Sequence, residues 1–104
     1  MDQVIDNIIQ QIISGYHPEK IYLFGSCVER NNTASSDIDL LIVKRTGENF
    51  YRRALEVHTL FKPYLYNLDI HVYTPEEFEA NKESINTIVY TVNKRGKLVY
   101  ESRT

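Results

Sequence analysis

The sequence predicts an α+β fold of the two-layer α/β kind, in which helices flank a small mixed sheet of about four strands. Three observations favour this fold. Apolar residues recur at helical spacing in some segments, and in others they form short runs or alternate with polar residues. Capping residues, glycines and prolines separate those segments. The length of 104 residues and the 42% hydrophobic content are typical of one globular domain, which we expect to span residues 1–104.

The chain begins with a predicted helix that is followed by a predicted strand. Six apolar residues form one stripe over residues 2–14, and Gly15 is a suitable stop. Residues 20–25, KIYLFG, form a short apolar run that ends in glycine, which predicts a buried strand. Ser26 is a suitable cap for a brief helix over residues 27–31.

The middle of the chain predicts a second strand and a second long helix. Residues 37–43, DIDLLIV, form an apolar run with an acidic start and predict the strand. Residues 48–61 predict the helix, which Pro63 ends. Its expected apolar stripe consists of Tyr51, Ala54, Leu55 and His58. Because His58 falls on that stripe, a packed role is favoured for it over a catalytic one.

The final third of the chain predicts two more strands. Residues 67–73, NLDIHVY, alternate in polarity, which places Asp69 and His71 on the face opposite the apolar side chains. Residues 97–100, KLVY, are short and mixed in polarity, so we expect an edge strand there.

Two helices are predicted between those strands. Thr74 begins the first one, since Pro75 suits a first helical turn and Glu77 completes a capping box. Ser84 is the expected cap of the second helix, which stops near Gly96. The residues expected to point inward from this helix are Ile85, Ile88, Val89 and Val92.

Composition and charge exclude several classes of protein. No apolar run approaches the roughly 20 residues that a bilayer span requires. The first residues contain no basic region, so the sequence predicts no signal peptide. We therefore expect no membrane partner. The single cysteine, Cys27, has no internal disulfide partner, which favours a cytoplasmic location. A formal charge of −2 argues against general nucleic-acid binding.

The charge is nevertheless uneven along the chain. Residues 44–66 carry five basic and two acidic residues, a balance of 5 − 2 = +3. The basic residues are Lys44, Arg45, Arg52, Arg53 and Lys62. A solvated helix face is the usual interpretation of such a cluster, and an anionic ligand or partner is the alternative.

The acidic residues of two predicted strands form a candidate metal site. Asp37 and Asp39 are two apart on a strand, so they share a face and lie about 6.6 Å apart along it. If the strand that carries Asp69 lies next to the strand of Asp37 and Asp39, the three carboxylates converge. Each pair of them would then repel by roughly 3 kcal/mol at a separation of about 5 Å and an effective dielectric constant of about 20. Magnesium prefers such hard oxygen ligands, whereas zinc lacks the clustered cysteines or histidines that it favours. Two ions would clamp an in-line displacement at phosphorus.

The Gly25-Ser26 pair that ends the first predicted strand suggests a phosphate-binding loop. Glycine lets the backbone approach a ligand closely, and a following helix offers free N–H groups to phosphate. A Gly-Ser pair alone is usually a turn, and an Asp-x-Asp alone is often a surface strand. It is their combination with Asp69 that favours a site for metal and a triphosphate.

These residues resemble those of the minimal nucleotidyltransferases of the DNA polymerase β superfamily. The shared pattern is Phe24-Gly25-Ser26, then ten residues, then an Asp-x-Asp, here Asp37-Ile38-Asp39 between Ser36 and Leu40, and a later single aspartate, here Asp69. The resemblance covers almost the whole chain.

The resemblance implies ATP or another nucleoside triphosphate as substrate and magnesium, with two ions, as cofactor. Asp37, Asp39 and Asp69 would be the catalytic residues and the metal ligands, and Asp69 would help to deprotonate the attacking hydroxyl. The implied nucleotide-binding residues are Gly25, Ser26, Arg30 and Ser36. Many small proteins of this kind are similar to antitoxins paired with an all-helical HEPN toxin, and some transfer AMP to a tyrosine of that toxin. A HEPN-type helical protein is therefore the expected partner.

The sequence departs from the usual pattern after Ser26. Relatives commonly have Gly-Ser-x-Ala-Arg-Gly, where x is any residue, whereas this chain has Cys27-Val28-Glu29-Arg30 after Gly25-Ser26. The acidic Glu29 replaces a basic residue near the expected phosphates, and Arg30 would restore the positive charge. The alternative function is therefore a weak or inactive nucleotidyltransferase scaffold that neutralises its partner by binding alone. Transfer to a small molecule or an RNA end is less favoured, because such enzymes generally use additional domains to bind their acceptor. Here a homo-oligomer would have to supply that binding surface.

Overall fold

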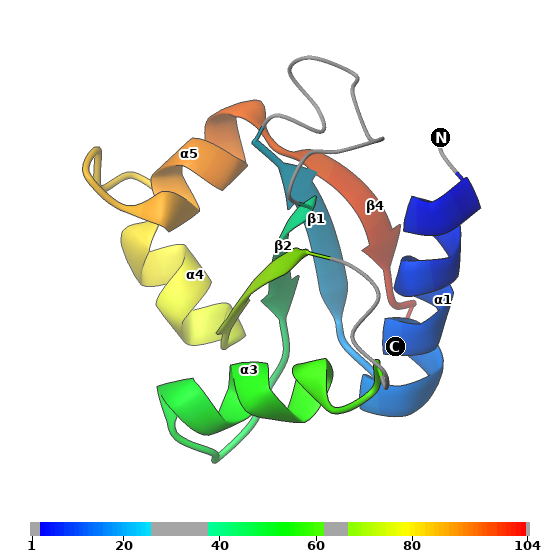
Figure 1. Cartoon of the computed structure of the whole chain (residues 1–104). Coiled ribbons are helices and arrows are strands. Elements are labelled where there is room, and N and C mark those ends of the chain that lie inside the picture. The colour runs from blue at the N-terminus through cyan, green and yellow to red at the C-terminus, as the bar shows by residue number, and fades with distance from the viewer. Residues whose placement is uncertain (1–2, 26–37, 62–66, 104) are drawn as a thin grey trace.

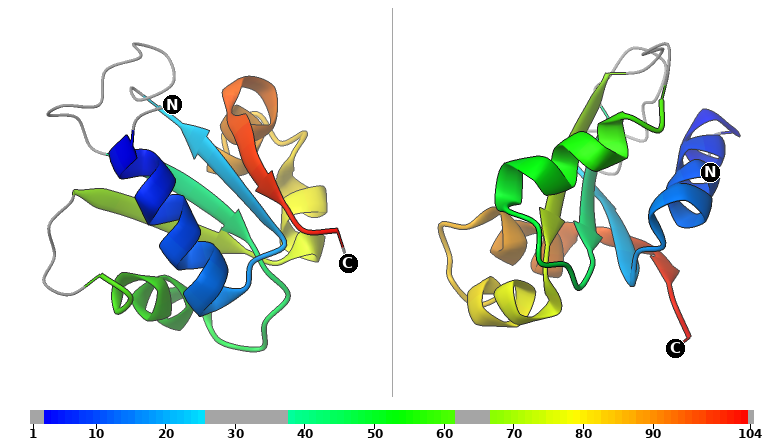
Figure 2. Two further views of the ribbon diagram at one scale, coloured as in Figure 1. Left: turned by 90° about the vertical axis from the view of Figure 1, so that its right-hand side faces the viewer. Right: turned by 90° about the horizontal axis from the view of Figure 1, so that it is seen from below.

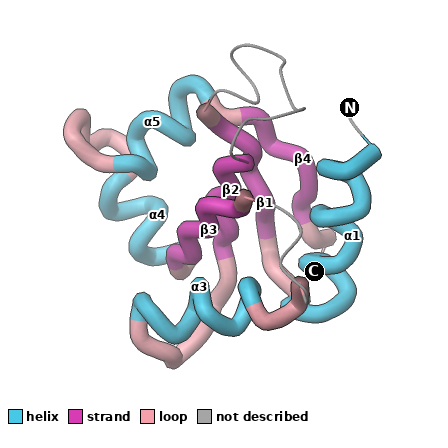
Figure 3. Tube along the Cα trace, viewed as in Figure 1, coloured by secondary structure: helices cyan, strands magenta, loops and turns pink. Residues whose placement is uncertain are grey.

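The computed structural model describes residues 3–25, 38–61 and 67–103 (Figure 1). The tube in Figure 3 shows the same course by type of secondary structure. In chain order the elements are α1 (Gln3–Tyr16), β1 (Lys20–Phe24), β2 (Ile38–Val43), α3 (Phe50–His58), β3 (Leu68–Tyr73), α4 (Pro75–Asn81), α5 (Ile88–Arg95) and β4 (Lys97–Glu101). The brief helix expected at 27–31 lies outside the described residues.

The four strands form one mixed sheet in the order β3-β2-β1-β4. β1 is antiparallel to both β2 and β4, whereas β2 and β3 run parallel. A parallel pair needs a crossover connection, and α3 lies in that connection. The predicted small mixed sheet flanked by helices is confirmed, with β4 at one edge as expected.

Helices cover both faces of this sheet (Figure 2, right). The structure thus has a layer of helices on each side of the sheet, whereas the sequence suggested two layers in all. On one face, α1 and α3 bury a cluster with the even-numbered residues of β2, Ile38, Leu40 and Ile42. On the other face, α4 and α5 bury a second cluster with Leu41 and Val43. β2 is therefore apolar on both faces, which explains its nearly continuous hydrophobic run.

The buried side of α3 differs from the predicted stripe. Tyr51 and Leu55 were expected to pack inward, but they are 85% and 58% exposed. Arg53 and Val57 are buried instead. The helix also begins at Phe50, because the side chain of the residue before it accepts a hydrogen bond from a first-turn N–H.

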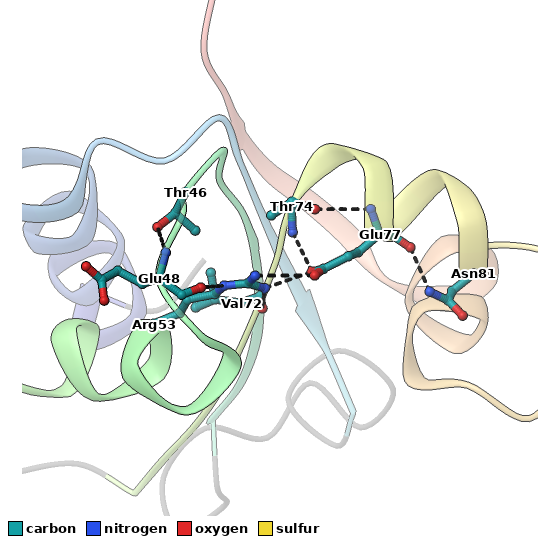
Figure 4. Close-up of polar contacts among 7 residues, drawn as sticks. All are labelled: Thr46, Glu48, Arg53, Val72, Thr74, Glu77 and Asn81. Carbon is teal, nitrogen blue, oxygen red and sulfur yellow. Dashed lines mark hydrogen bonds and ion pairs between the residues drawn. The ribbon is translucent and has the colours of Figure 1, made fainter.

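Arg53 is buried because its guanidinium finds acceptors in the loop before α3, on β3 and on α4 (Figure 4). It donates to the Glu48 carbonyl at 2.8 Å, to the Val72 carbonyl at 3.4 Å, and to both carboxylate oxygens of Glu77 at 2.8 and 3.3 Å. Glu77 also accepts from the Thr74 N–H, and its own N–H donates to the Thr74 hydroxyl. The predicted capping box is confirmed, and the same carboxylate joins α4 to α3.

The start of α5 is a second correction. Thr87, not Ser84, is the cap, and its hydroxyl accepts a hydrogen bond from the Tyr90 N–H at 3.1 Å. Ser84 lies in the preceding turns, in which the Thr87 N–H donates to its carbonyl. Ile85 therefore precedes the helix and is 72% exposed. The predicted stop is confirmed, since the Gly96 N–H donates to the Val92 carbonyl.

No helix in the described part of the chain combines the length and the apolar character that crossing a bilayer would demand.

Candidate functional site

Three strands have an end at the same end of the sheet. β1 ends there, and β2 and β3 begin there, because β1 is antiparallel to β2 and β2 is parallel to β3. The register pairs Phe24 with Asp39, and it pairs Asp39 with Asp69. Residues from three separate parts of the sequence therefore form one row across the sheet.

Asp39 and Asp69 lie on the same face of the sheet. Directly paired residues on neighbouring strands point the same way, and the even-numbered residues of both strands fill the core under α1 and α3. The two carboxylates therefore belong to the opposite face. Asp39 is half-buried and the side chain of Asp69 is 61% exposed, so both remain in reach of a ligand. The condition set for convergence of the carboxylates, that these two strands are neighbours, is met.

Gly25 lies against the carboxylate of Asp39. Its backbone has φ +79°, a conformation that residues with a Cβ seldom adopt. A Cβ added at this position would lie 3.2 Å from Asp39 Cγ and would collide with Asp39 Oδ2. The glycine thus allows the backbone to turn sharply beside a carboxylate.

His71 is the residue of this region to which the sequence gave no role. Alternation along β3 places it on the face of Asp69, and its Nε2 lies 3.4 Å from Asp69 Oδ1. Its ring contacts Phe24 with 6.0 Å between the ring centroids. The imidazole therefore lies next to the carboxylate row.

The remaining predicted site residues, Ser26, Arg30, Ser36 and Asp37, lie outside the described residues. Within residues 3–25, 38–61 and 67–103, no three His, Cys, Asp or Glu side chains form a group suited to a metal ion. The described part of the site is therefore the pair of aspartates with the glycine beside them.

These residues fit magnesium. Both side chains offer carboxylate oxygens, the ligands that this ion prefers, and it is commonly held by one or two carboxylates together with substrate phosphates. A Cβ at Gly25 would overlap Asp39 Oδ2, so the glycine leaves this carboxylate oxygen uncrowded by a side chain. Two carboxylates in neighbouring positions also repel one another, which favours binding of a cation.

The basic cluster of residues 44–66 is engaged within the chain. Lys44 contacts the ring and the carbonyl of Tyr16. The three arginines form ion pairs, Arg45 with Glu76, Arg52 with Glu48 and Arg53 with Glu77. Lys62 lies outside the described ranges. Intramolecular ion pairs and a cation–π contact therefore account for the cluster in the described residues, and the interpretation as an anion site gains no support from them.

The comparisons with known proteins identify the family and the fold of this chain. Residues 7–104 match the family model described as "Polymerase beta, Nucleotidyltransferase". A candidate nucleotidyltransferase from Sulfolobus solfataricus has a similar structure, with a TM-score of 0.64 and 22% sequence identity, over 95% of this chain and 78% of that one. At that identity the likeness shows a shared fold. No curated protein matches the sequence. Because the family model covers nearly the whole length, the chain belongs to the Polymerase beta, Nucleotidyltransferase family.

Proposed function

We propose that this protein transfers a nucleoside monophosphate, AMP from ATP, to an acceptor hydroxyl and releases pyrophosphate. The observation that carries the proposal is the register of Asp39 with Asp69 on neighbouring parallel strands, with Gly25 against Asp39. A nucleotidyltransfer site needs carboxylates that converge and a backbone that approaches the phosphates closely. Asp39 and Asp69 would meet the first need and Gly25 the second.

The chemistry is an in-line displacement at the α-phosphorus. The acceptor oxygen attacks this phosphorus, the bond from the α-phosphorus to the bridging oxygen breaks, and pyrophosphate leaves with that electron pair. The proton of the acceptor hydroxyl passes to Asp69, whose exposed carboxylate is accessible to an entering substrate. Gly25 and Ser26 bind the β- and γ-phosphates through the backbone and a hydroxyl, with Arg30 and Ser36 as further nucleotide contacts.

Magnesium would be held by Asp37, Asp39 and Asp69, and two such ions would neutralise charge on the attacking and leaving oxygens. The role of the chain is to fix the carboxylates and to position the acceptor relative to the triphosphate. The positions of Asp39 and Asp69 are set by strand pairing, which is more rigid than a loop.

The acceptor that we propose is a tyrosine of a HEPN-type helical toxin, so that the protein acts as a cytoplasmic antitoxin. This assignment rests on the resemblance of the Gly25-Ser26 and Asp37-Ile38-Asp39 motifs to small antitoxins of that kind. A tyrosine hydroxyl is a suitable nucleophile once a base removes its proton.

Transfer is tested by incubating the protein with radiolabelled ATP, magnesium and a HEPN partner. We expect label on the partner, and we expect Asp39→Asn to lower the rate by roughly 10²- to 10³-fold, as for the loss of one electrostatic group at a reaction centre. Asp6→Asn is the matched control, because it removes an exposed acid on α1 that is remote in sequence from the site. A wild-type chain that never labels a partner which a related enzyme labels would contradict the proposal.

Binding without chemistry is the second candidate function, and Glu29 favours it because an acid near the expected phosphates weakens nucleotide affinity. The double variant Asp37→Asn/Asp39→Asn distinguishes the two functions. If this variant protects cells from the toxin as well as wild type does, contact suffices; loss of protection with retained binding supports transfer.

A further inference from the structure

The Nε2 atom of His71 is buried but has no hydrogen-bond partner among the described residues. Buried polar atoms are nearly always bonded, so an exception calls for an explanation. The His71 side chain as a whole is 24% exposed, which means that the ring is oriented with this nitrogen inward. Packing alone would favour an apolar side chain here.

The polar atom that this nitrogen faces is Asp69 Oδ1, at 3.4 Å. An N–H···O hydrogen bond is typically 2.7–3.2 Å long, so the pair is only a few tenths of an ångström beyond bonding distance. The terminal torsion of an aspartate is broad, so rotation of the carboxylate can bring an oxygen nearer to this nitrogen and into line with it. The two groups are therefore placed to bond without movement of the strand.

The imidazole ring is held in place from two sides. His71 is paired in register with Leu41, which is fully buried on β2, and its ring contacts Phe24 at the end of β1. Phe24 immediately precedes Gly25, which turns the chain beside Asp39. The ring thus contacts the strand end that leads into the proposed phosphate loop as well as the proposed base.

We infer that His71 is a positioning residue for Asp69, an inference that rests on the proposed function of this site. The imidazole donates its Nε2–H to Asp69 Oδ1 and fixes the orientation of the carboxylate. Asp69 Oδ2 then stays available for a cation and for the proton of the acceptor hydroxyl. Carboxylates that bind metals are commonly held in this way by a neighbouring donor, and loss of such a donor typically lowers metal affinity or activity by roughly 10- to 100-fold.

The test measures Mn²⁺ affinity by electron paramagnetic resonance, since Mn²⁺ accepts the same carboxylate ligands as Mg²⁺. We expect His71→Leu to raise the Kd for Mn²⁺ by roughly 10- to 100-fold. His71→Gln, whose amide N–H can reach the same carboxylate, should stay within about threefold of wild type. His58→Leu is the matched control, because it removes a histidine from α3 and should leave the Kd unchanged.

The outcomes separate this inference from the proposed function. A wild-type chain that binds no Mn²⁺ overturns both. A wild-type chain that binds Mn²⁺, together with a His71→Leu variant of equal affinity, overturns the positioning role alone, even if the variant melts at a lower temperature.

A second measurement does not depend on how the variants fold. Nitrogen-15 NMR of the cation-free wild-type protein reports which ring nitrogen of His71 carries the proton. The inference requires a proton on Nε2. A neutral ring with its only proton on Nδ1 leaves Asp69 without a donor and overturns the positioning role.

Discussion

Gly25 illustrates how a single residue can determine both backbone and site geometry. The chain leaves β1 through a positive φ of +79°, and this turn brings the backbone against the Asp39 carboxylate. Both features exclude a side chain, the first through backbone strain and the second through direct collision. The sequence predicted the glycine as a phosphate-loop residue, but the contact with Asp39 depends on the pairing of two strands.

Gly25→Ala should therefore lower the free energy of unfolding by at least about 1–2 kcal/mol, the cost of a left-handed conformation for a residue with a Cβ. Gly47→Ala is the matched control, since a Cβ there meets nothing within 4 Å and its φ is not positive. That control should be neutral or stabilise the fold by about 0.4–1 kcal/mol. Urea unfolding measures both. Equal stability of the two variants would contradict the importance of the turn.

Glu77 is the residue whose ionisation should be most visible in the stability of the fold. Its hydrogen bond to Arg53 is the main cause that holds the pKa of this carboxyl below its usual 4.5, and the Thr74 N–H contributes in the same direction. A carboxyl with a lowered pKa in the folded chain stabilises the fold above the unfolded pKa, and this contribution is lost as pH falls through the folded pKa.

The expected result is a steeper fall in Tm for wild type than for Glu77→Gln as pH drops below about 4.5. Glu79→Gln serves as the control on the same helix, because its ion pair with Lys82 is largely exposed and should matter little. Melting curves followed by circular dichroism from pH 7 to pH 3 measure the effect. Parallel curves for wild type and Glu77→Gln would exclude the proposed linkage.

At the scale of elements, helices and strands were predictable to different degrees. The first three strands and α1 follow from apolar patterns, because their buried positions are occupied by apolar residues. α3 did not follow, since one of its buried positions is Arg53 and the carboxylate that compensates it, Glu77, lies 24 residues further on. Local sequence cannot reveal a partner that only tertiary packing brings near, so the pattern of Tyr51 and Leu55 was misleading.

The start of α5 provides a test of a cap that the sequence misplaced. Thr87→Ala removes the side-chain acceptor for the Tyr90 N–H and should cost about 1 kcal/mol of unfolding free energy. Ser84→Ala, at the position that the sequence favoured, should change stability by less than about 0.5 kcal/mol. Thermal or urea unfolding of the two single variants decides between the two caps. A larger loss at Ser84 than at Thr87 would contradict the structure.

For the whole molecule, β2 is the element on which both cores depend. Leu40 and Leu41 are adjacent and fully buried, yet the first belongs to the cluster under α1 and α3 and the second to the cluster under α4 and α5. The sequence predicted a buried strand here. It did not reveal which helices lie on each face. A continuous apolar run is typical of any strand that is buried on both faces, and it carries no information about the helices that cover it.

Leu40→Ala and Leu41→Ala should each lower the free energy of unfolding by about 2–5 kcal/mol, although they damage opposite faces. Leu55→Ala is the control, since that side chain is 58% exposed and its truncation should cost less than about 0.5 kcal/mol. Denaturant unfolding monitored by far-ultraviolet circular dichroism measures all three. A negligible effect at either buried leucine would show that one of the two cores contributes little.

The meeting of three strand ends also has a consequence for the nascent chain on the ribosome. Gly25 and Asp39 emerge early, but the third strand of the row enters the sheet only after the α3 crossover has been synthesised. Until Asp69 has left the exit tunnel and β3 has aligned with β2, the carboxylate pair does not exist. A partly translated or prematurely terminated chain therefore cannot assemble this acidic pair, and any chemistry that depends on it begins only after β3 has folded.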